Sequence, residues 1–317
     1  MKKKVLVIIN PCAGRTKSKP ATFDIADVLS SLDFDFDIKV TKKRGDATEF
    51  ARTLSNGYDA VLCCGGDGTL NEIVNGIMKL EKKPQVGYIP TGSTNDFAAT
   101  IGIPSDIRSA VQLMASDQRN CFDIGNFNER NFCYIATFGV GSEFSYSTPQ
   151  KLKNALGYPA YMLNTFVLNG VHLLKSIKPV HITIEHDGGV IDGDYFFGAI
   201  SNSTSVGGLF TYSKDDVKLN DGIFELLLVK NIKSVPNAVK MLRKMQKHDY
   251  NCDQITFMHT RMLKIYSPQK AAWSLDGEYG GTPEEIDFSI SHPGIEIFSP
   301  PNELFSAEKD EAALTKN

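Results

Sequence analysis

The chain reads Val61-Leu62-Cys63-Cys64-Gly65-Gly66-Asp67-Gly68-Thr69-Leu70-Asn71-Glu72 where an apolar run meets three glycines. The apolar part is typical of a buried strand, and the following segment, Leu70–Leu80, is typical of a helix. A glycine turn before a helix exposes backbone N–H groups beside the positive end of the helix dipole, which suits phosphate oxygens. Asp67 would repel a bare phosphate, so its presence predicts a divalent cation beside that phosphate. The stretch therefore indicates nucleotide chemistry.

The first 125 residues alternate short apolar segments with polar-faced segments of helical length. Strands are expected at Lys4–Asn10, Asp35–Thr41, Ala60–Cys64 and Gln85–Pro90, and helices near Pro20–Leu32, Asp46–Leu54, Leu70–Leu80 and Ile107–Ser116. This alternation predicts an α/β domain built on a parallel sheet with helices on both faces. Ligands of such sheets bind at the carboxyl ends of the strands.

The remainder of the chain predicts a second domain, an antiparallel β-sandwich. Several of its segments alternate apolar and polar residues, as strands with one exposed face do. The strand-like segments are Phe132–Phe138, Val180–His186, Tyr195–Ser201, Ile223–Val229, Met262–Ser267, Glu285–Ser291 and Gly294–Phe298, with one helix at about Pro236–Lys247. The predicted domains span residues 1–125 and 126–298, and residues from about 299 to 317 could pack back on the first domain.

Composition places the chain among folded soluble proteins. Its 317 residues can bury a large core, and 42% hydrophobic and 22% charged residues are ordinary values. The formal net charge of −3 gives no bulk attraction to nucleic acid. The amino-terminal apolar run is too short for a secretory core, and no run approaches the roughly 18 apolar residues that span a bilayer. Six cysteines without metal-ligand or redox spacing indicate a reducing cytoplasm.

Three more polar turns follow predicted strands and would lie at the same sheet edge as Asp67. They are Asn10–Arg15, Thr41–Ala47 and Pro90–Asp96. Small residues in the first turn let a ligand approach the backbone, and Arg15 could bind a phosphate or be an ordinary surface arginine. Each turn alone could be a plain loop or the start of a helix. Their coincidence at one edge favours a shared phosphate site.

Two acidic segments of the second domain could carry chemistry. Asp276 and Glu278 flank a glycine, so one carboxylate could take a hydroxyl proton while the other orients it or holds a cation. A hairpin turn with Asp-Gly at its centre is the simpler interpretation of the same residues. The loop Asp215–Ile223 could hold a hard cation through a carboxylate, backbone carbonyls and water, or be an ordinary turn.

Taken together, these motifs resemble the diacylglycerol kinase family, in its soluble bacterial lipid-kinase branch that also includes sphingosine and ceramide kinases. The resemblance covers about residues 3–300. The matching motifs are Asn10-Pro11-x-Ala13-Gly14, Thr41-x3-Gly45-Asp46-Ala47, Gly65–Thr69 with Asn71-Glu72, Pro90-x-Gly92-x2-Asn95-Asp96-Phe97-Ala98, Asp221-Gly222 and Leu275-Asp276-Gly277-Glu278. Arg15 stands where the family often has lysine, and Ser93 where threonine is usual. Both departures keep the chemical type of the side chain.

The resemblance implies a kinase that transfers phosphate from ATP, with Mg²⁺, to a lipid hydroxyl. The expected acceptor is diacylglycerol, and the expected product is phosphatidic acid for phospholipid metabolism. The first domain would bind the nucleotide and the second the lipid. The expected setting is the cytoplasm, with transient contact with the inner face of the membrane and no nucleic acid partner. Many members of the family form homodimers, which the residues alone neither require nor exclude.

Site residues follow from the resemblance position by position. The residues that would surround ATP are Asn10, Pro11, Cys12, Ala13, Gly14, Arg15, Thr41, Gly65, Gly66, Asp67, Gly68, Thr69, Asn71, Glu72, Ser93 and Thr94. Asp276 would be the general base with Glu278 as its partner, and Asp67 is the third catalytic candidate. A structural cation would sit near Asp221, completed by the carbonyls of Lys218 and Ile223.

Other functions stay open at this point. NAD kinase is similar in architecture and also uses a Gly-Gly-Asp-Gly turn, although the Asp276–Glu278 motif late in the chain argues against it. The acceptor could be another lipid, namely a sphingoid base, ceramide or phosphatidylglycerol. A regulator without catalysis is disfavoured, because the chain keeps Asp67 and both later carboxylates.

A lipid substrate also requires an apolar channel. The aromatic, helix-like segment Pro149–Lys175 is a candidate wall of that channel, although core packing explains it better. Four lysines flank the segment and could touch anionic headgroups. They are Lys151, Lys153, Lys175 and Lys178.

Overall fold

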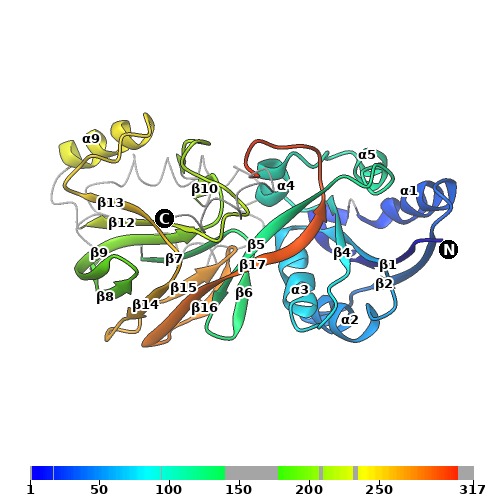
Figure 1. Cartoon of the computed structure of the whole chain (residues 1–317), viewed down its shortest axis with the longest axis horizontal. Helices are drawn as coiled ribbons and strands as arrows, with labels where there is room; N and C mark the ends of the chain where they lie inside the picture. The colour runs from blue at the N-terminus through cyan, green and yellow to red at the C-terminus, as the bar shows by residue number, and fades with distance from the viewer. Residues whose placement is uncertain are drawn as a thin grey trace, which may run out of the picture.

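A computed structural model of the chain describes residues 2–16, 18–93, 95–139, 178–206, 210–230 and 235–305 (Figure 1). The molecule consists of an α/β lobe and a β-rich lobe, joined by two long strands, β5 (Arg119–Phe127) and β17 (Glu285–Phe298). The predicted aromatic segment Pro149–Lys175 lies outside the described residues, together with Lys151, Lys153 and Lys175.

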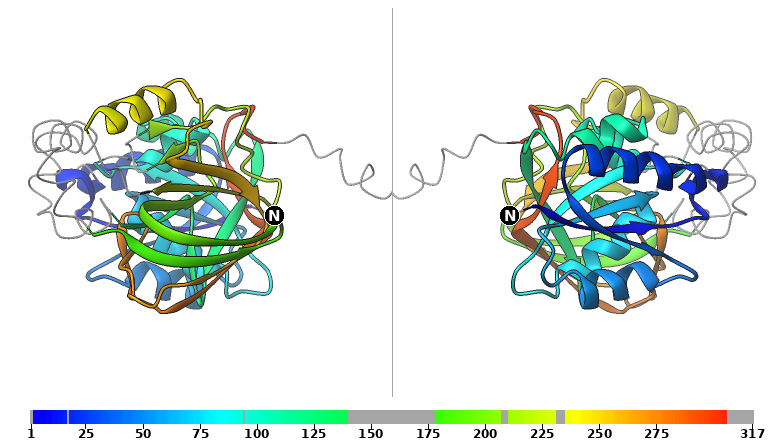
Figure 2. Two further views of the ribbon diagram at one scale, coloured as in Figure 1. Left: turned by 90° about the vertical axis from the view of Figure 1, so that its left-hand side faces the viewer. Right: turned by 90° about the vertical axis from the view of Figure 1, so that its right-hand side faces the viewer.

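The α/β lobe is built on four parallel strands in the order β4-β3-β1-β2. The strands are β1 (Lys4–Ile9), β2 (Asp35–Val40), β3 (Ala60–Gly65) and β4 (Gln85–Pro90). The helices are α1 (Ser18–Ser31), α2 (Asp46–Leu54), α3 (Asp67–Ile77), α4 (Asp96–Ile101) and α5 (Ile107–Gln112), with a short 3-10 helix over Ala13–Thr16. α1 packs beside α5 on one face of the sheet, and α2 beside α3 on the other (Figure 2).

The central strands of this lobe are buried. Nearly every residue of β1 and β3 is buried, because helices cover both faces of the sheet. This is why both strands appear in the sequence as unbroken apolar runs rather than alternating ones. Full burial of such side chains is the main favourable term in folding, at roughly 1.5–3 kcal/mol for each large apolar side chain. The strands therefore form a fixed platform for the turns at their carboxyl ends.

The β-rich lobe continues the same hydrogen-bonded sheet. β17 pairs in parallel with β4 at Ile297 and Val86, and antiparallel with β5, so the sheet passes from one lobe into the other. The other elements are β6 (Arg130–Phe132), β7 (Ile135–Gly139), β8 (Val180–His186), β9 (Gly189–Ser201), β10 (Ser205–Val206), β11 (Phe210–Thr211), β12 (Phe224–Lys230), α9 (Val235–Met245), β13 (Ile255–Thr260), β14 (Leu263–Tyr266), β15 (Trp273–Leu275) and β16 (Glu278–Gly281). The strand pairs among these elements that the structure describes are antiparallel.

An aromatic cluster forms the core behind the β15–β16 hairpin. Trp273 is completely buried, and its ring centroid lies 5.4 Å from that of Phe127, 4.9 Å from Phe138 and 5.5 Å from Phe288. Aromatic pairs at such distances add about 0.5–1.5 kcal/mol each beyond the area that they bury. The hairpin that carries Asp276 is thus anchored by its first strand.

The predicted fold class is confirmed, because parallel strands form the first part of the chain and antiparallel strands the second. Two details differ from expectation. The segment Phe132–Phe138 is not one strand: β6 ends at Phe132 and β7 begins at Ile135, because the intervening N–H groups bond to Asp276 instead of a neighbouring strand. The predicted strands Glu285–Ser291 and Gly294–Phe298 are one strand, β17, with an irregular register in between.

The segment after β17 returns toward the α/β lobe. The Asn302 side chain donates to the carbonyl of Thr100 at the end of α4 (3.1 Å), and the buried Leu304 accepts from the backbone of Leu219 (2.8 Å). The division into domains at about residue 125 stays a prediction, since one sheet runs through both parts. Among the described residues, no helix has the length and apolar character needed to cross a membrane.

Candidate active site

The glycine turn between β3 and α3 forms the floor of the site. Gly66 is the residue that caps α3, and its carbonyl accepts the first two bonds of the helix, from the N–H groups of Thr69 (2.9 Å) and Leu70 (3.1 Å). The remaining N–H groups of the first turn have no partner within the helix, as at every helix N-terminus. Together with the helix dipole, they favour a negatively charged group at this turn.

The turn after β1 is bonded directly to the glycine turn. The Asn10 side chain donates to the hydroxyl of Thr69 (2.9 Å), and its backbone N–H donates to the carbonyl of Cys64 (2.9 Å). Gly14 in the same turn has φ +55°, and a Cβ at this position would overlap the carbonyl oxygen of Thr91. The first turn is therefore pressed against the turn after β4.

The turn after β4 lies against the glycine turn as well. The N–H of Thr91 donates to the carbonyl of Gly65 (2.8 Å), and a Cβ added to Gly66 would lie only 3.1 Å from Cα of Gly92. The structure thus brings three of the predicted phosphate turns together at one edge of the sheet. Ser93 is exposed at this edge, and Thr94 lies outside the described residues.

The basic turn after β2 is held to α3 by Glu72. The Glu72 carboxylate accepts from the N–H of Gly45 (3.0 Å), and its carbonyl accepts from the hydroxyl of Thr48 (2.8 Å). Thr41 continues the sheet by donating its N–H to the carbonyl of Ile9 (2.9 Å). Glu72 therefore positions a neighbouring turn, and its contact with ATP stays a prediction.

Asp67 lies beside a second carboxylate, that of Asp96, which belongs to the motif Pro90–Ala98. Its side chain accepts from the Tyr88 hydroxyl (3.2 Å) and from the N–H of Asp96, the first residue of α4 (3.0 Å). Burial raises the pKa of Asp67 to about 6, and the Asp96 carboxylate adds to the rise. Burial also raises the pKa of Asp96. Two carboxylates crowded in this way favour a cation between them and a bound phosphate.

Asp276 and Gly277 are the two central residues of the β15–β16 hairpin. Both have positive φ, +48° and +80°, and the hairpin pairs Leu275 with Glu278. Two-residue hairpins prefer this conformation, and Asp-Gly is among the sequences best suited to it. The simpler interpretation of the motif as a hairpin turn is therefore correct, and the turn also delivers two carboxylates to the site.

The Asp276 carboxylate is almost completely buried, with 5% of the residue exposed, and accepts four hydrogen bonds. Oδ2 accepts from the Asn71 side chain (2.7 Å) and from the N–H of Cys133 (2.6 Å). Oδ1 accepts from the N–H groups of Tyr134 and Ile135, both at 3.0 Å. Burial raises the pKa of Asp276, while these donors oppose the rise. A carboxylate offers about four acceptor positions, so all are used.

Glu278 has the opposite environment. Its side chain is 52% exposed, and Oε2 lies 3.3 Å from a guanidinium nitrogen of Arg44. Its other oxygen, Oε1, would lie 3.7 Å from a Cβ on Gly68. The Glu278 carboxylate therefore stands over the glycine turn with acceptor positions open to a ligand. It comes from the β-rich lobe, whereas the turn beneath it belongs to the α/β lobe.

The predicted structural-cation loop precedes β12. Asp221 accepts from the N–H of Ile223 (3.0 Å), and the Lys218 ammonium donates to the carbonyl of Glu303 (2.8 Å). Asp123 lies close by and accepts from the N–H of Gly222 (2.7 Å). Burial raises the pKa of Asp221, and the Asp123 charge adds to the rise. Within the described ranges, no three side chains of His, Cys, Asp or Glu are placed to hold a metal ion by themselves.

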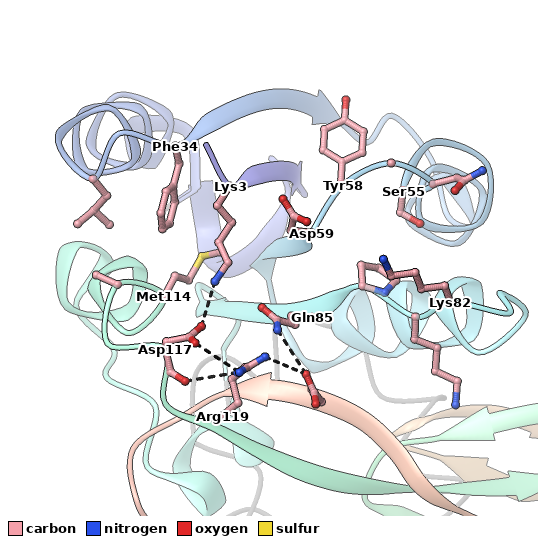
Figure 3. A pocket seen from close by; sticks show the side chains of 17 residues that line it. Lys3, Phe34, Ser55, Tyr58, Asp59, Lys82, Gln85, Met114, Asp117 and Arg119 are labelled. Carbon is pink, nitrogen blue, oxygen red and sulfur yellow. Dashed lines mark hydrogen bonds and ion pairs between the residues drawn. The ribbon is translucent and has the colours of Figure 1, made fainter. Parts of the chain in front are cut away.

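A separate hollow of about 1050 Å³ lies at the amino ends of β1, β3 and β4, away from the glycine turns (Figure 3). Four of its charged groups pair with one another: Lys3 with Asp117 (3.1 Å), and Arg119 with Asp117 and Glu296 (3.3 Å each). None of the predicted site residues lines it. We therefore place the candidate active site at the opposite, carboxyl edge of the sheet.

Sequence reasoning missed several members of the site. The N–H groups of Cys133 to Ile135 leave no side-chain signal, because backbone groups exist at every position. Asp96 was visible in the motif but could equally start a helix. Arg130, which donates to the carbonyl of Tyr279 (3.0 Å), stands in a hairpin whose proximity to Glu278 only the fold reveals.

Comparisons with known proteins agree with this geometry. Residues 4–127 match the family model of the diacylglycerol kinase catalytic domain. The chain is 33% identical over 281 residues to a diacylglycerol kinase of Bacillus subtilis strain 168, which covers 88% of this chain and 91% of that protein. It is also 33% identical over 301 residues to a diacylglycerol kinase of Staphylococcus saprophyticus, with 95% and 96% covered.

Solved structures show the same fold. The crystal structure of a diacylglycerol kinase from Bacillus anthracis superposes with a TM-score of 0.71 at 22% identity, covering 94% of this chain and 97% of that one. Another crystal structure from the same organism gives a TM-score of 0.78 at 25% identity, with 94% and 96% covered. The sequence relatives match at 33% identity over nearly the full length of both chains, so the chain belongs to the diacylglycerol kinase family.

Proposed function

We propose that this protein is a lipid kinase that transfers the γ-phosphoryl group of ATP to the free hydroxyl of diacylglycerol and so forms phosphatidic acid for phospholipid metabolism. The observation that carries the proposal is the hydrogen bond from Asn71 to Asp276 (2.7 Å). It joins the helix of the phosphate turn to the hairpin with the two carboxylates. A donor site and an acceptor site for phosphoryl transfer are thereby brought to one place, in a chain whose relatives are diacylglycerol kinases.

The three joined turns would hold the triphosphate. Backbone N–H groups at the start of α3 face the site, and the Asn10–Thr69 bond keeps the turn after β1 in place beside them. Phosphoryl transfer depends mainly on such positioning and on charge stabilisation rather than on covalent chemistry by the protein. In this proposal the turn after β1, which Gly14 allows to pack against the Thr91 carbonyl, also contacts the nucleotide.

The residues present fit a Mg²⁺ ion that arrives with ATP. Mg²⁺ is usually bound by one or two carboxylates, with phosphates and water completing its shell. Asp67 and Asp96 supply two adjacent hard oxygen donors, and burial raises the pKa of both carboxyl groups. When bound, the ion would neutralise charge on the phosphates. We extend the same reasoning to a structural cation at Asp221, with the carbonyls of Lys218 and Ile223.

The two carboxylates of the hairpin would have different tasks. The resemblance implies Asp276 as the general base, but its four acceptor positions are occupied. We therefore favour Glu278 as the group that receives the hydroxyl proton, with Asp276 fixing the hairpin on α3. In the step, the hydroxyl oxygen bonds to the γ-phosphorus, the bond from that phosphorus to the ADP oxygen breaks, and the proton goes to Glu278.

The setting of the reaction follows from the substrate. Diacylglycerol resides in a bilayer, so the kinase would work in the cytoplasm with transient contact with the inner face of the membrane. A homodimer stays part of the proposal by analogy with the family. Cross-linking and light scattering of the purified protein test that state, and a flotation assay with liposomes tests the membrane contact.

A phosphotransfer assay separates this function from its competitors. Purified protein is incubated with γ-labelled ATP, Mg²⁺ and one acceptor at a time: diacylglycerol in mixed micelles, a sphingoid base, ceramide, phosphatidylglycerol or NAD. We expect label in phosphatidic acid, at rates at least tenfold above those with the other acceptors. Preferential labelling of NAD would show a NAD kinase, and preference for another lipid would replace the acceptor. Glu278→Gln serves as the inactive control.

A further inference from the structure

We propose that Arg44 and Arg130 together form an anion-binding pair that contacts the phosphoryl group during its transfer. The inference rests on the proposed function and adds to it the groups that neutralise the moving phosphate. The two arginines come from different lobes: Arg44 from the turn between β2 and α2, and Arg130 from the first position of β6. They meet at the start of β16, where Arg44 contacts Glu278, the carboxylate that stands over the glycine turn, and Arg130 contacts the next residue.

The contacts place both guanidinium groups beside the reacting centre. Arg44 lies 3.3 Å from Glu278, and Arg130 donates to the carbonyl of the next residue, Tyr279 (3.0 Å). Glu278 in turn approaches Gly68 in the turn that would hold the phosphates. An anion bound at the start of α3 would therefore lie within reach of both side chains.

Charges of both signs act on one another at this point. The guanidinium groups of Arg44 and Arg130 repel each other, and the carboxylates of Glu278 and Asp276 act against that repulsion. Partial burial lowers the pKa of Arg130, and the like charge of Arg44 lowers it further, with Glu278 and Asp276 acting in the opposite direction. Two like charges at close range repel each other, and solvent weakens this repulsion because Arg44 and Arg130 are both exposed. A phosphoryl group brings the negative charge that removes this repulsion.

Both arginines are held by the elements that build the site. Gly45, next to Arg44, is bonded through its N–H to Glu72 on α3 (3.0 Å). Arg130 begins β6, whose next residue, Asn131, receives hydrogen bonds from Asn71 and Asn75 of the same helix. The 71% exposed side chain of Arg44 can turn toward a ligand, whereas Arg130 is fixed at the hairpin. We therefore assign the larger effect to Arg130.

Arginine suits this task because its planar fork binds two phosphate oxygens at once. In phosphoryl transfer, negative charge is spread over the oxygens of the moving group, and a guanidinium placed there stabilises the transition state more than bound ATP. The pair should accordingly affect kcat more than the KM for ATP. Loss of one well-placed donor costs about 100-fold or more in kcat in other enzymes.

The test compares Arg130→Gln, Arg130→Lys and Arg44→Gln with a control, Arg108→Gln, which removes an arginine that is paired with Asp24 and Asp27 on α1. We expect kcat to fall about 100-fold in Arg130→Gln and about 10-fold in Arg44→Gln, with the KM for ATP within threefold and the control unchanged. Arg130→Lys should recover only part of kcat, because it keeps the charge but loses the fork.

A binding measurement that needs no lipid makes the result independent of the acceptor. We expect wild-type protein to bind ADP with Mg²⁺ and aluminium fluoride, a mimic of the moving phosphoryl group, more tightly than ADP with Mg²⁺ alone. Arg130→Gln should lose this difference and keep its affinity for ADP and its melting temperature. The proposed anion-binding pair would be refuted if Arg130→Gln kept the wild-type difference in affinity between the two ligands. It would also be refuted if the variant lost affinity equally for ADP with and without aluminium fluoride. Failure of the wild type to phosphorylate diacylglycerol would refute the proposed acceptor and leave this measurement standing.

Discussion

The side-chain amide of Asn71 donates a 2.7 Å hydrogen bond to Oδ2 of Asp276, across 205 residues of sequence. The same amide donates to the carbonyl of Asn131 (3.2 Å), and Asn75, one helical turn further, donates to that carbonyl as well (3.0 Å). Two asparagines on one face of α3 therefore connect the phosphate turn, the β5–β6 hairpin and the carboxylate hairpin. The two halves of the site have a defined separation because of this connection.

Asn71→Ala should lower both stability and activity. The substitution leaves the buried Asp276 carboxylate with three donors instead of four, and a hydrogen bond to a charged group contributes about 1.5–3 kcal/mol. Denaturant unfolding should show a loss of that size, and kcat should fall at least tenfold. Asn75→Ala is the comparison, since it removes the bonds of Asn75 to Asn131 and to the Asn71 side chain and leaves the direct bond from Asn71 to Asp276. Equal effects of the two variants on kcat would contradict the role of Asn71.

Asp276→Asn should mainly lower stability, whereas Glu278→Gln should mainly lower kcat. At Asp276, an amide NH₂ would face two N–H donors, and a buried carboxylate partner would be lost, so we expect destabilisation by about 3 kcal/mol or more. At the half-exposed Glu278, stability should stay within about 0.5 kcal/mol of wild type, while kcat falls about 100-fold or more through loss of the proton acceptor. Thermal unfolding and steady-state kinetics measure the two effects. A stable but inactive Asp276→Asn beside an active Glu278→Gln would return the base to Asp276.

Asp67→Asn should change how stability depends on pH in the absence of nucleotide and metal. The folded pKa of about 6 exceeds the ordinary value of 3.8. In the folded state Asp67 therefore holds its proton more tightly than in the unfolded state, so its contribution to stability is greatest below pH 4 and is lost as pH rises through 6. The decline amounts to at most ~3 kcal/mol. Asp67→Asn should lack it, and so be more stable than wild type at pH 7 and no more stable at pH 4. Parallel curves for the two proteins would contradict the shifted pKa.

Gly14→Ala should separate two turns of the nucleotide site. A Cβ would overlap the Thr91 carbonyl, in addition to the strain of a positive φ. We expect the Kd for ATP to rise at least tenfold, measured by calorimetry. Gly57→Ala shares the positive φ but has nothing within 4 Å of the added Cβ. It should cost about 1–2 kcal/mol of stability and leave ATP binding unchanged. Matching Kd values for ATP in both variants would argue against contact between nucleotide and this turn.

The effect of Asp221→Asn on the melting temperature should depend on whether Mg²⁺ is present. Without the ion, removing a buried charge beside Asp123 should leave the melting temperature equal or higher. With millimolar Mg²⁺, wild type should gain stability by mass action, and the variant should not. The exposed Asp215 in the same loop provides the control, Asp215→Asn, which should respond to Mg²⁺ like wild type. A wild-type melting temperature that ignores Mg²⁺ would remove the structural cation from the proposal.

The sequence predicts those features of the fold that depend on local patterns. Buried parallel strands such as β1 and β3 appear as continuous apolar runs, and the helix after Gly66 is predicted three residues too late at each end, as Leu70–Leu80 instead of Asp67–Ile77. β5 and the two strands of the β15–β16 hairpin are not predicted, although the Asp-Gly turn between those strands is, because β5 mixes polar with apolar residues and the hairpin strands are only three and four residues long. Their pairing is decided by contacts that are distant in sequence.

The sequence predicts which side chains of the site could take part in chemistry. It does not predict their burial or their hydrogen-bond partners. Asp276 and Glu278 are visible as a carboxylate pair, yet the sequence cannot tell that one is buried under four donors and the other half exposed. Three of those donors are backbone N–H groups, which only a break between β6 and β7 makes available. Glu72 shows the same limit, since its contact with Gly45 depends on how α2 packs on α3.

The single register pair between Ile297 and Val86 has a mechanical consequence. β17 is hydrogen-bonded to β4 on one side and to β5 on the other, so the two lobes share one sheet. A hinge motion that separates the lobes would have to break hydrogen bonds of this sheet. Binding and release of nucleotide and lipid should instead depend on small displacements of the turns and arginine side chains around the active site. Amide exchange along β17 would then stay slow throughout turnover.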